Sequence, residues 1–177
     1  MSADPIQFTT VITSLGPLLV AASERGVCRV AFDEGRAELQ TRYPERVLIK
    51  DGEDACRFIT DVVQAVEEPA RRHTIPLDLE GTPFQCRVWE ALLTIPAGET
   101  RSYGELAASL GLGSGSGRAV GGANGANRIA VLVPCHRVVA ADGTLGGYAY
   151  GLAIKHELLR REGASVATHS QQASLFA

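Results

Sequence analysis

Residues 132–139 read LVPCHRVV, which places a cysteine beside a histidine at the end of an apolar run. The run IAVLV predicts a short buried strand over 129–133. Pro134 removes a backbone donor and fixes the chain direction, so Cys135 is expected to emerge where that strand stops. A thiolate is a strong nucleophile, and His136 supplies an adjacent base. The stretch therefore predicts a reactive cysteine, against the alternative that Cys135 is a small core residue.

Two short helices are predicted upstream of this stretch. Ser102 with Glu105 three positions later is a capping box, which favours a helix over 103–110. The loop GLGSGSG follows, and GRAVGGA then predicts a second short helix over 117–123. Two short helices with a glycine-rich connection are typical of a helix-turn-helix. A helix over 83–94 precedes them, because Thr-Pro is a good helix start.

The remaining segments predict an α/β chain with two domains. Alternating apolar residues and turn signals indicate an antiparallel meander, followed by two helices, an extended stretch and, near the end of the chain, a last helix. We expect the strands over 6–13, 18–22 and 27–32, the helices over 36–43, 54–67 and 152–161, and the extended stretch over 71–80. We place the domains at 1–80 and 81–166, and we expect 167–177 to be a flexible tail.

Composition narrows the class of protein. The chain has 177 residues, of which 45% are hydrophobic, so it can bury a core. We find no signal peptide and no apolar run that could span a membrane. The four cysteines are not closely spaced, so we expect no disulfide framework. Free cysteines favour the reducing cytoplasm as the location of the protein. Residues 1–81 carry a net charge of −5 and residues 82–177 carry +2, so the second half can lie against phosphates.

Several motifs together resemble one known family. PCHRVV at 134–139 matches the active-site hexapeptide of the O6-alkylguanine-DNA alkyltransferases, also called methylated-DNA–protein-cysteine methyltransferases. RAVGGA at 118–123 resembles their recognition helix, and 81–111 and 151–163 resemble the segments around it. The resemblance implies a small ribonuclease-H-like α/β N-terminal domain with an antiparallel sheet. It also implies a helical, winged-helix-like C-terminal domain that contains the helix-turn-helix.

The resemblance assigns a catalytic role to four residues. Cys135 would take the alkyl group from O6 of a damaged guanine, and His136 would draw the thiol proton through a water. Glu162, from the closing Glu-Gly pair, would orient the imidazole, although sequence alone does not place it in contact. Asn127 would hold backbone near the site and tie the hinge of the recognition helix to it. Without the resemblance, Asn127 is equally well explained as a turn residue.

Further residues are assigned to DNA and to the base pocket. Arg118 would enter the minor groove and fill the gap left by the extruded base, where the plainer reading is a surface arginine on a phosphate. Adjacent glycines in a helix are costly, which a close approach to DNA or tight helix packing would explain. The resemblance implies that Tyr103, Arg118, Ala119, Gly121 and Gly122 bind DNA, and that Val138, Tyr148, Ala149 and Lys155 form the pocket.

Two positions depart from some family members. Ala149 stands where some have a serine, so its side chain cannot donate a hydrogen bond to O6. Tyr150 stands where some have a smaller residue and would either narrow the pocket or pack outside it. Both positions leave the range of accepted alkyl groups open.

The resemblance predicts a single-turnover DNA repair protein, active on double-stranded DNA through the minor groove. We expect no cofactor, no metal, no membrane and a monomer, with cooperative binding along DNA left open. One alternative is a lesion-sensing protein without transfer chemistry, which the presence of Cys135 disfavours. A second is the C-terminal half of a bifunctional adaptive-response regulator, which we expect less because the chain begins with Met and has no upstream cysteine-rich domain. A third is a cysteine hydrolase with repeated turnover.

Overall fold

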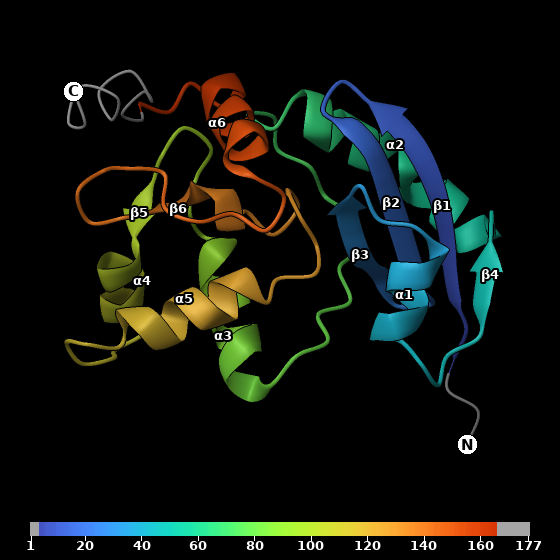
Figure 1. Ribbon diagram of the computed structural model, residues 1–177, viewed down its shortest axis with the longest axis horizontal. Helices are drawn as coiled ribbons and strands as arrows, with labels where there is room; N and C mark the ends of the chain where they lie inside the picture. The colour runs from blue at the N-terminus through green and yellow to red at the C-terminus, as the bar shows by residue number, and fades with distance from the viewer. Residues whose placement is uncertain (1–3, 166–177) are drawn as a thin grey trace.

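The computed structural model describes residues 4–165, which form two halves lying side by side (Figure 1). The first half holds a four-stranded sheet with helices, and the second is mainly helical with a two-stranded sheet. The mixed α/β class that we predicted is therefore confirmed, while the predicted tail over 167–177 lies outside the described residues. Within the described range, no helix has both the length and the apolar character needed to cross a membrane.

The larger sheet has the order β3-β2-β1-β4. The first three strands form the predicted antiparallel meander, and β4 adds parallel to β1. Side chains alternate across β2, because successive residues of a strand point to opposite faces. Leu18 and Val20 join the main core with α2, whereas Leu19 joins a smaller cluster with Leu39 of α1. The strands are β1 (Ile6–Thr13), β2 (Gly16–Ser23), β3 (Gly26–Phe32) and β4 (Leu48–Lys50).

Every helix predicted from the sequence is present, with ends within a few residues of those expected. Two of the helix starts have the predicted side-chain caps: Thr82 Oγ1 accepts from the Gln85 amide at 3.2 Å, and Ser102 Oγ accepts from the Glu105 amide at 3.1 Å. Helices α4 and α5 pack against each other as the predicted helix pair. The helices are α1 (Arg36–Arg42), α2 (Glu53–Glu67), α3 (Pro83–Leu92), α4 (Tyr103–Ser109), α5 (Gly117–Gly125) and α6 (Leu152–Arg161).

The predicted strand over 129–133 is wrong. The segment is a turn in which the Leu132 amide donates to the Ala130 carbonyl at 2.8 Å and the Val133 amide donates to the Ile129 carbonyl at 3.0 Å. Four of its five residues, all but Leu132, are buried, and burial does not require an extended backbone. The short strands on either side, β5 (Arg101–Ser102) and β6 (Val138–Val139), pair in parallel and were not predicted.

The free edge of β3 joins the two halves. Val30 donates to the Arg128 carbonyl and accepts from the Ala130 amide, both at 3.0 Å. Further along the same edge, Val27 exchanges hydrogen bonds with the chain segment around Leu77. The segment that leads to Cys135 is therefore fixed to the sheet of the first half, and one buried core runs through both halves.

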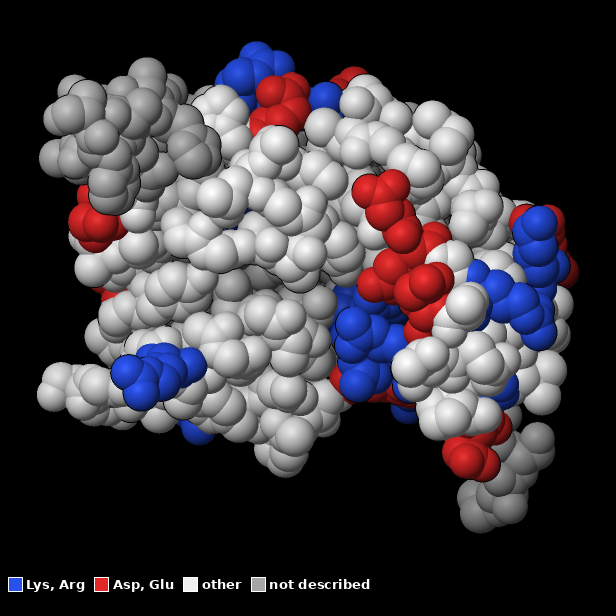
Figure 2. All heavy atoms as spheres, in the orientation of Figure 1, with Lys and Arg blue, Asp and Glu red and all other residues white. Residues whose placement is uncertain are grey.

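Charge is unevenly distributed over the surface. Figure 2 shows acidic groups gathered over the half that contains the large sheet, while the region over α4 and α5 is almost free of them on this face. The distribution matches the charge difference between residues 1–81 and 82–177. The helix pair is the part of this face that can approach a polyanion with least repulsion.

Candidate active site

Cys135 lies at the start of a single 3₁₀ turn, Cys135–Arg137, rather than at the end of a strand. Cys135 is only 7% exposed to solvent, and its sulfur lies 3.1 Å from Nδ2 of Asn127. An amide donor at this distance favours the thiolate form, whereas burial disfavours it. Burial dominates and raises the pKa of the Cys135 thiol, so the resting side chain is protonated at neutral pH.

Asn127 connects the sulfur to the backbone on both sides of the turn. Besides the sulfur, its Nδ2 donates to the Val133 carbonyl at 2.9 Å, and its Oδ1 accepts from the Ile129 amide at 3.0 Å. The side chain is buried and its polar atoms are occupied within the protein. The structure therefore favours the predicted role of Asn127, which is to hold the backbone near the site, over that of an ordinary turn residue.

His136, Glu162 and Arg137 form a buried chain of hydrogen bonds behind the cysteine. His136 Nε2 lies 2.8 Å from Oε1 of Glu162, and the Arg137 guanidinium donates to both oxygens of the same carboxylate. Arg137 also donates to the Ile95 carbonyl. The side chains of His136 and Glu162 are fully buried, so the carboxylate fixes the orientation of the ring.

The charges of this chain follow from burial and pairing. Burial lowers the pKa of His136, which keeps the imidazole neutral at pH 7 despite the nearby carboxylate. For Glu162, burial raises the pKa, but hydrogen bonds from His136 and Arg137 outweigh it and the pKa lies below its usual value. The site thus holds a neutral base next to a fixed negative charge, which can stabilise the imidazolium once the ring takes a proton.

A cavity of about 260 Å³ opens beside the sulfur. This volume is close to the lower end of ligand pockets in proteins, which span about 300–1,000 Å³. The walls come from α5, from the start of α4 and from the loop before α6. They consist of Tyr103, Gly121, Asn124, Gly125, Asn127, Cys135, Gly147, Tyr148, Ala149 and Tyr150.

Unpartnered polar atoms are concentrated at this site. Within residues 4–165, three buried side-chain atoms have no hydrogen-bond partner: Oδ1 of Asn124, Nδ1 of His136 and the hydroxyl of Tyr148. Asn124 and Tyr148 line the cavity, and His136 follows the cysteine. A buried polar group without a partner costs about 1–3 kcal/mol, so three at one site indicate groups reserved for a ligand and for proton transfer.

Comparison with known proteins agrees with this geometry. Residues 83–164 match the family model described as the DNA binding domain of 6-O-methylguanine DNA methyltransferase. The methylated-DNA–protein-cysteine methyltransferase of Mycobacterium tuberculosis is 42% identical over 158 residues, which cover 89% of this chain and 92% of that protein. The chain belongs to the methylated-DNA–protein-cysteine methyltransferase family.

Two further comparisons show how much of the chain resembles other proteins. The bifunctional transcriptional activator/DNA repair enzyme Ada of Escherichia coli is 40% identical over 161 residues, but the chain spans only 45% of that protein's length. A crystal structure of M. tuberculosis OGT in complex with DNA is similar with a TM-score of 0.76 and 40% identity, over 89% of this chain and 92% of the other.

Most of the residues predicted for a methyltransferase site lie together. Asn127 contacts the Cys135 sulfur, and the adjacent His136 pairs with Glu162. The cavity is lined by Tyr103, Gly121, Tyr148 and Ala149, among others. Three predicted DNA-binding residues lie outside it: Arg118, Ala119 and Gly122 are exposed on α5. Tyr150, left between two interpretations by the sequence, does both: it lines the cavity and packs edge-on against Phe32, with ring centroids 5.5 Å apart.

Val138 and Lys155, predicted as pocket residues, do not line the cavity. Lys155 is fully buried behind the loop, where its ammonium donates to the carbonyls of Val138, Leu145 and Gly147. Burial lowers the pKa of Lys155 to about 8. Lys155 therefore holds the loop that carries Tyr148 in place.

Two polar residues of the site, Asn124 and Arg137, were not predicted. Asn124 lines the cavity, and its buried position near the end of α5 could have been suspected because it is an amide among small residues. Arg137 lies inside the matched hexapeptide, but the motif gave it no role. Its partners, Glu162 and the Ile95 carbonyl, are 25 and 42 positions away, and nothing in the local sequence indicates them.

Proposed function

We propose that this protein repairs DNA by transferring the alkyl group of O6-alkylguanine, chiefly O6-methylguanine, to the sulfur of Cys135. The observation that carries the proposal is a cavity of about 260 Å³ lined by Cys135, with two unpartnered polar atoms on its walls and a third on the adjacent His136. The names of the relatives describe the same chemistry. A thioether has no good leaving group for hydrolysis, so each molecule acts once and no cofactor takes part.

Proton transfer is assigned to the His136 ring. Its Nε2 is engaged by Glu162, which leaves Nδ1 to accept the thiol proton through a water. The thiolate then attacks the alkyl carbon, the C–O bond breaks and guanine leaves with the bonding electrons. Burial raises the pKa of the half-buried Tyr103, so its hydroxyl stays protonated and can donate to the departing base.

The lesion reaches the cavity by rotation of its nucleotide out of the duplex. A stacked base cannot present its O6 substituent to a buried sulfur, and extrusion costs a few kcal/mol. The exposed face of α5 supplies the contact with the minor groove. At Gly122 an added Cβ would meet nothing within 4 Å, so internal packing does not explain the glycine, whereas close approach of a DNA backbone does.

The proposal is tested by intact-mass spectrometry after incubation with duplex DNA that carries one O6-methylguanine. We expect a gain of one methyl group per molecule, mapped to Cys135 by peptide analysis, and no second gain with excess substrate. Unmodified protein after prolonged incubation with bound DNA would support a lesion sensor instead. Repeated product release beyond one equivalent would support a hydrolase.

Replacing Arg118 with alanine should slow repair without loss of fold. Arg118 is exposed at the first turn of α5, where it can occupy the space of the extruded base. We expect the transfer rate to fall roughly tenfold to a hundredfold, in line with a few kcal/mol for extrusion. Single-turnover kinetics would measure it, with the exposed Arg57 of α2 replaced by alanine as the control. Equal rates for both variants would contradict the assignment.

Tyr150 should limit the size of the alkyl group. Its ring lines the cavity and is held between Phe32 and Tyr148, with its hydroxyl 3.5 Å from the Val30 carbonyl. Tyr150→Gly is expected to raise the rate with O6-benzylguanine relative to O6-methylguanine by at least about tenfold. Tyr150→Phe keeps the ring and should show the unaltered ratio. The measurement is competition between the two substrates.

The transfer rate should rise with pH between 6 and 9. Burial raises the pKa of Cys135, so the thiolate fraction increases throughout this range. Burial lowers the pKa of His136, so the rise that accompanies deprotonation of this base is displaced towards the acid end. Single-turnover rates at saturating DNA would check this, and a maximum near pH 7 would contradict it.

We also propose the finer organisation that the family resemblance implies. Residues 1–80 would form a ribonuclease-H-like domain and 81–166 a winged-helix-like domain that binds DNA. The backbone hydrogen bonds between β3 and residues 128–130 support a fixed arrangement of the two domains. We still predict a cytoplasmic location, a monomer and no bound metal. Cooperative binding along DNA is left open.

A further inference from the structure

Val131 has an unusual backbone conformation. Among the described residues, three that are not glycine have positive φ: Asp33, Asp51 and Val131, at 53°, 53° and 68°. Aspartate tolerates the left-handed region, because its short polar side chain can hydrogen-bond locally. A β-branched residue there is a genuine outlier with a strained backbone. Val131 lies four positions before Cys135.

Two tight turns carry the chain from the sheet to the sulfur. Across Val131, the Leu132 amide donates to the Ala130 carbonyl at 2.8 Å, which together with positive φ is the rare, strained form of the three-residue turn. Across Pro134, the Cys135 amide donates to the Val133 carbonyl at 2.8 Å. Pro134 has φ −80° and ψ 59°, the relaxed mirror form. The direction of the chain into the site is therefore set at these two residues.

Hydrogen bonds hold this segment at both ends. At its start, Val30 of β3 bonds to the backbone of Arg128 and Ala130. At its end, Asn127 Nδ2 contacts the Val133 carbonyl and the Cys135 sulfur. The backbone between these anchors, which includes Val131, therefore sets the direction from which the chain reaches the sulfur.

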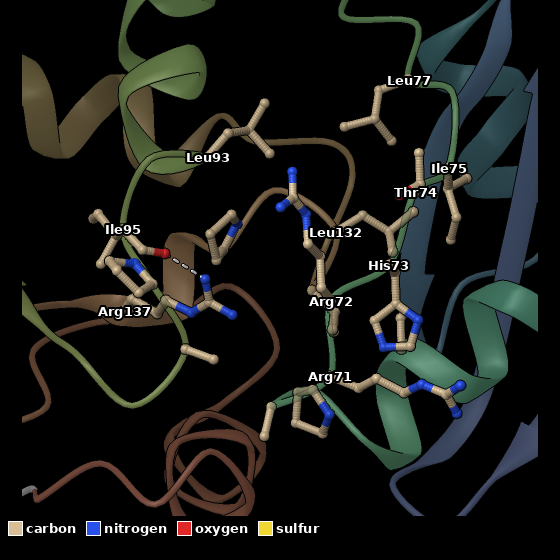
Figure 3. Close-up of a pocket in the computed structure, with 17 residues that line it drawn as sticks. Arg71, Arg72, His73, Thr74, Ile75, Leu77, Leu93, Ile95, Leu132 and Arg137 are labelled. Atoms are coloured by element: carbon tan, nitrogen blue, oxygen red, sulfur yellow. Dashed lines mark hydrogen bonds between the residues drawn. The ribbon is translucent and has the colours of Figure 1, made fainter.

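The side chain of Val131 is buried in the main core, while one side of the turn borders open space. A second cavity of about 630 Å³ lies there, lined by residues of 65–77, 93–97 and 131–137, Val131 and Pro134 among them. Figure 3 shows Arg137 from the catalytic chain on one side of this cavity and the segment around His73 on the other, and Leu132 from the turn also lines it. On the side of this cavity the turn is held by its own backbone hydrogen bonds.

Glycine would be the usual residue for this conformation, since it reaches positive φ without strain. Glycine also moves over a wide range there, whereas valine has only a narrow allowed region. We propose that Val131 is a positioning residue for alkyl transfer, whose narrow left-handed conformation aims the Cys135 sulfur at the cavity. The protein would accept a loss of stability for a fixed direction of attack. This inference rests on the proposed transfer function.

The test compares Val131→Gly with Val131→Ala. Neither variant has the valine methyl groups, so the pair differs mainly in backbone freedom. We expect Val131→Gly to unfold at the higher temperature, because alanine is strained at positive φ. We expect it nevertheless to transfer methyl from saturating O6-methylguanine duplex about tenfold more slowly than Val131→Ala, since small misplacements of reacting groups are costly. Modification of Cys135 by iodoacetamide, mapped by peptide mass spectrometry, should be equal in both.

If Val131→Gly is the more stable variant but the slower in transfer, Val131 positions the sulfur. If its role is only structural, the less stable variant should also be the slower one. A glycine variant that transfers as fast as the alanine variant, or faster, would overturn the proposal. Val131→Asn gives a second comparison if alanine prevents folding, since asparagine accepts positive φ over a narrower range than glycine. It should transfer faster than Val131→Gly. Wild-type protein without any transfer would refute the proposed function itself, a result distinct from equal rates among variants.

Discussion

Cys135→Ala is expected to take up no methyl group from DNA that contains O6-methylguanine, while it still binds the duplex. The sulfur is the only part of the proposed machinery that forms a bond to the alkyl carbon, so no neighbouring group can replace it. Alanine is smaller and apolar, and Cys135 is buried, so the turn should retain its shape. Transfer is measured by intact mass, and binding by fluorescence anisotropy with labelled duplex.

The chain supplies a matched control for this experiment. Cys56 is an exposed free thiol on α2, remote from the site in sequence and in the fold, and Cys56→Ala should repair at the unaltered rate. A methyl gain in Cys135→Ala would show that another residue is the nucleophile. Loss of uptake in both variants would point to damage of the fold rather than of the chemistry.

Helices and caps could be predicted because they depend on local sequence. Thr82 and Ser102 begin their helices with the bonds that their types and spacing indicate, and α6 has the predicted ends at 152 and 161. The turn over 129–133 could not be predicted in this way. Its apolar pattern reports burial, while its shape is set by β3, about a hundred residues earlier, and by the side chain of Asn127.

The residues of the site also fall into those that local sequence predicts and those that it does not. The residues of the hexapeptide could be assigned from a motif, and Glu162 could be suspected by residue type. The arrangement that gives them chemistry depends on contacts between distant segments: Arg137 with Ile95, and Lys155 with the loop carbonyls. Lys155 illustrates the limit, because a lysine on a helix is ordinarily solvated, and only the fold shows that its ammonium is enclosed.

Glu162→Gln should give the second-largest loss of transfer. The carboxylate orients the His136 ring and is the negative charge that would stabilise the imidazolium formed when the thiol is deprotonated. A neutral amide keeps the size but removes the charge and supplies a donor where an acceptor is needed. We expect the single-turnover rate to fall by about 10²–10⁴, the range seen when the orienting carboxylate of a triad is made neutral.

Stability must be separated from chemistry in this variant, because Arg137 loses its charged partner and is largely buried. Glu157→Gln is the matched control: it removes a carboxylate from the same helix, but one paired with Arg160 and Arg161 away from the cysteine. A lower unfolding temperature with Glu162→Gln is expected from the broken pair. At a temperature where both variants are folded, the carboxylate acts on proton transfer if only Glu162→Gln is slow and its rate recovers towards high pH, where the thiol ionises without help. A rate loss that is the same at every pH would assign Glu162 to the fold alone.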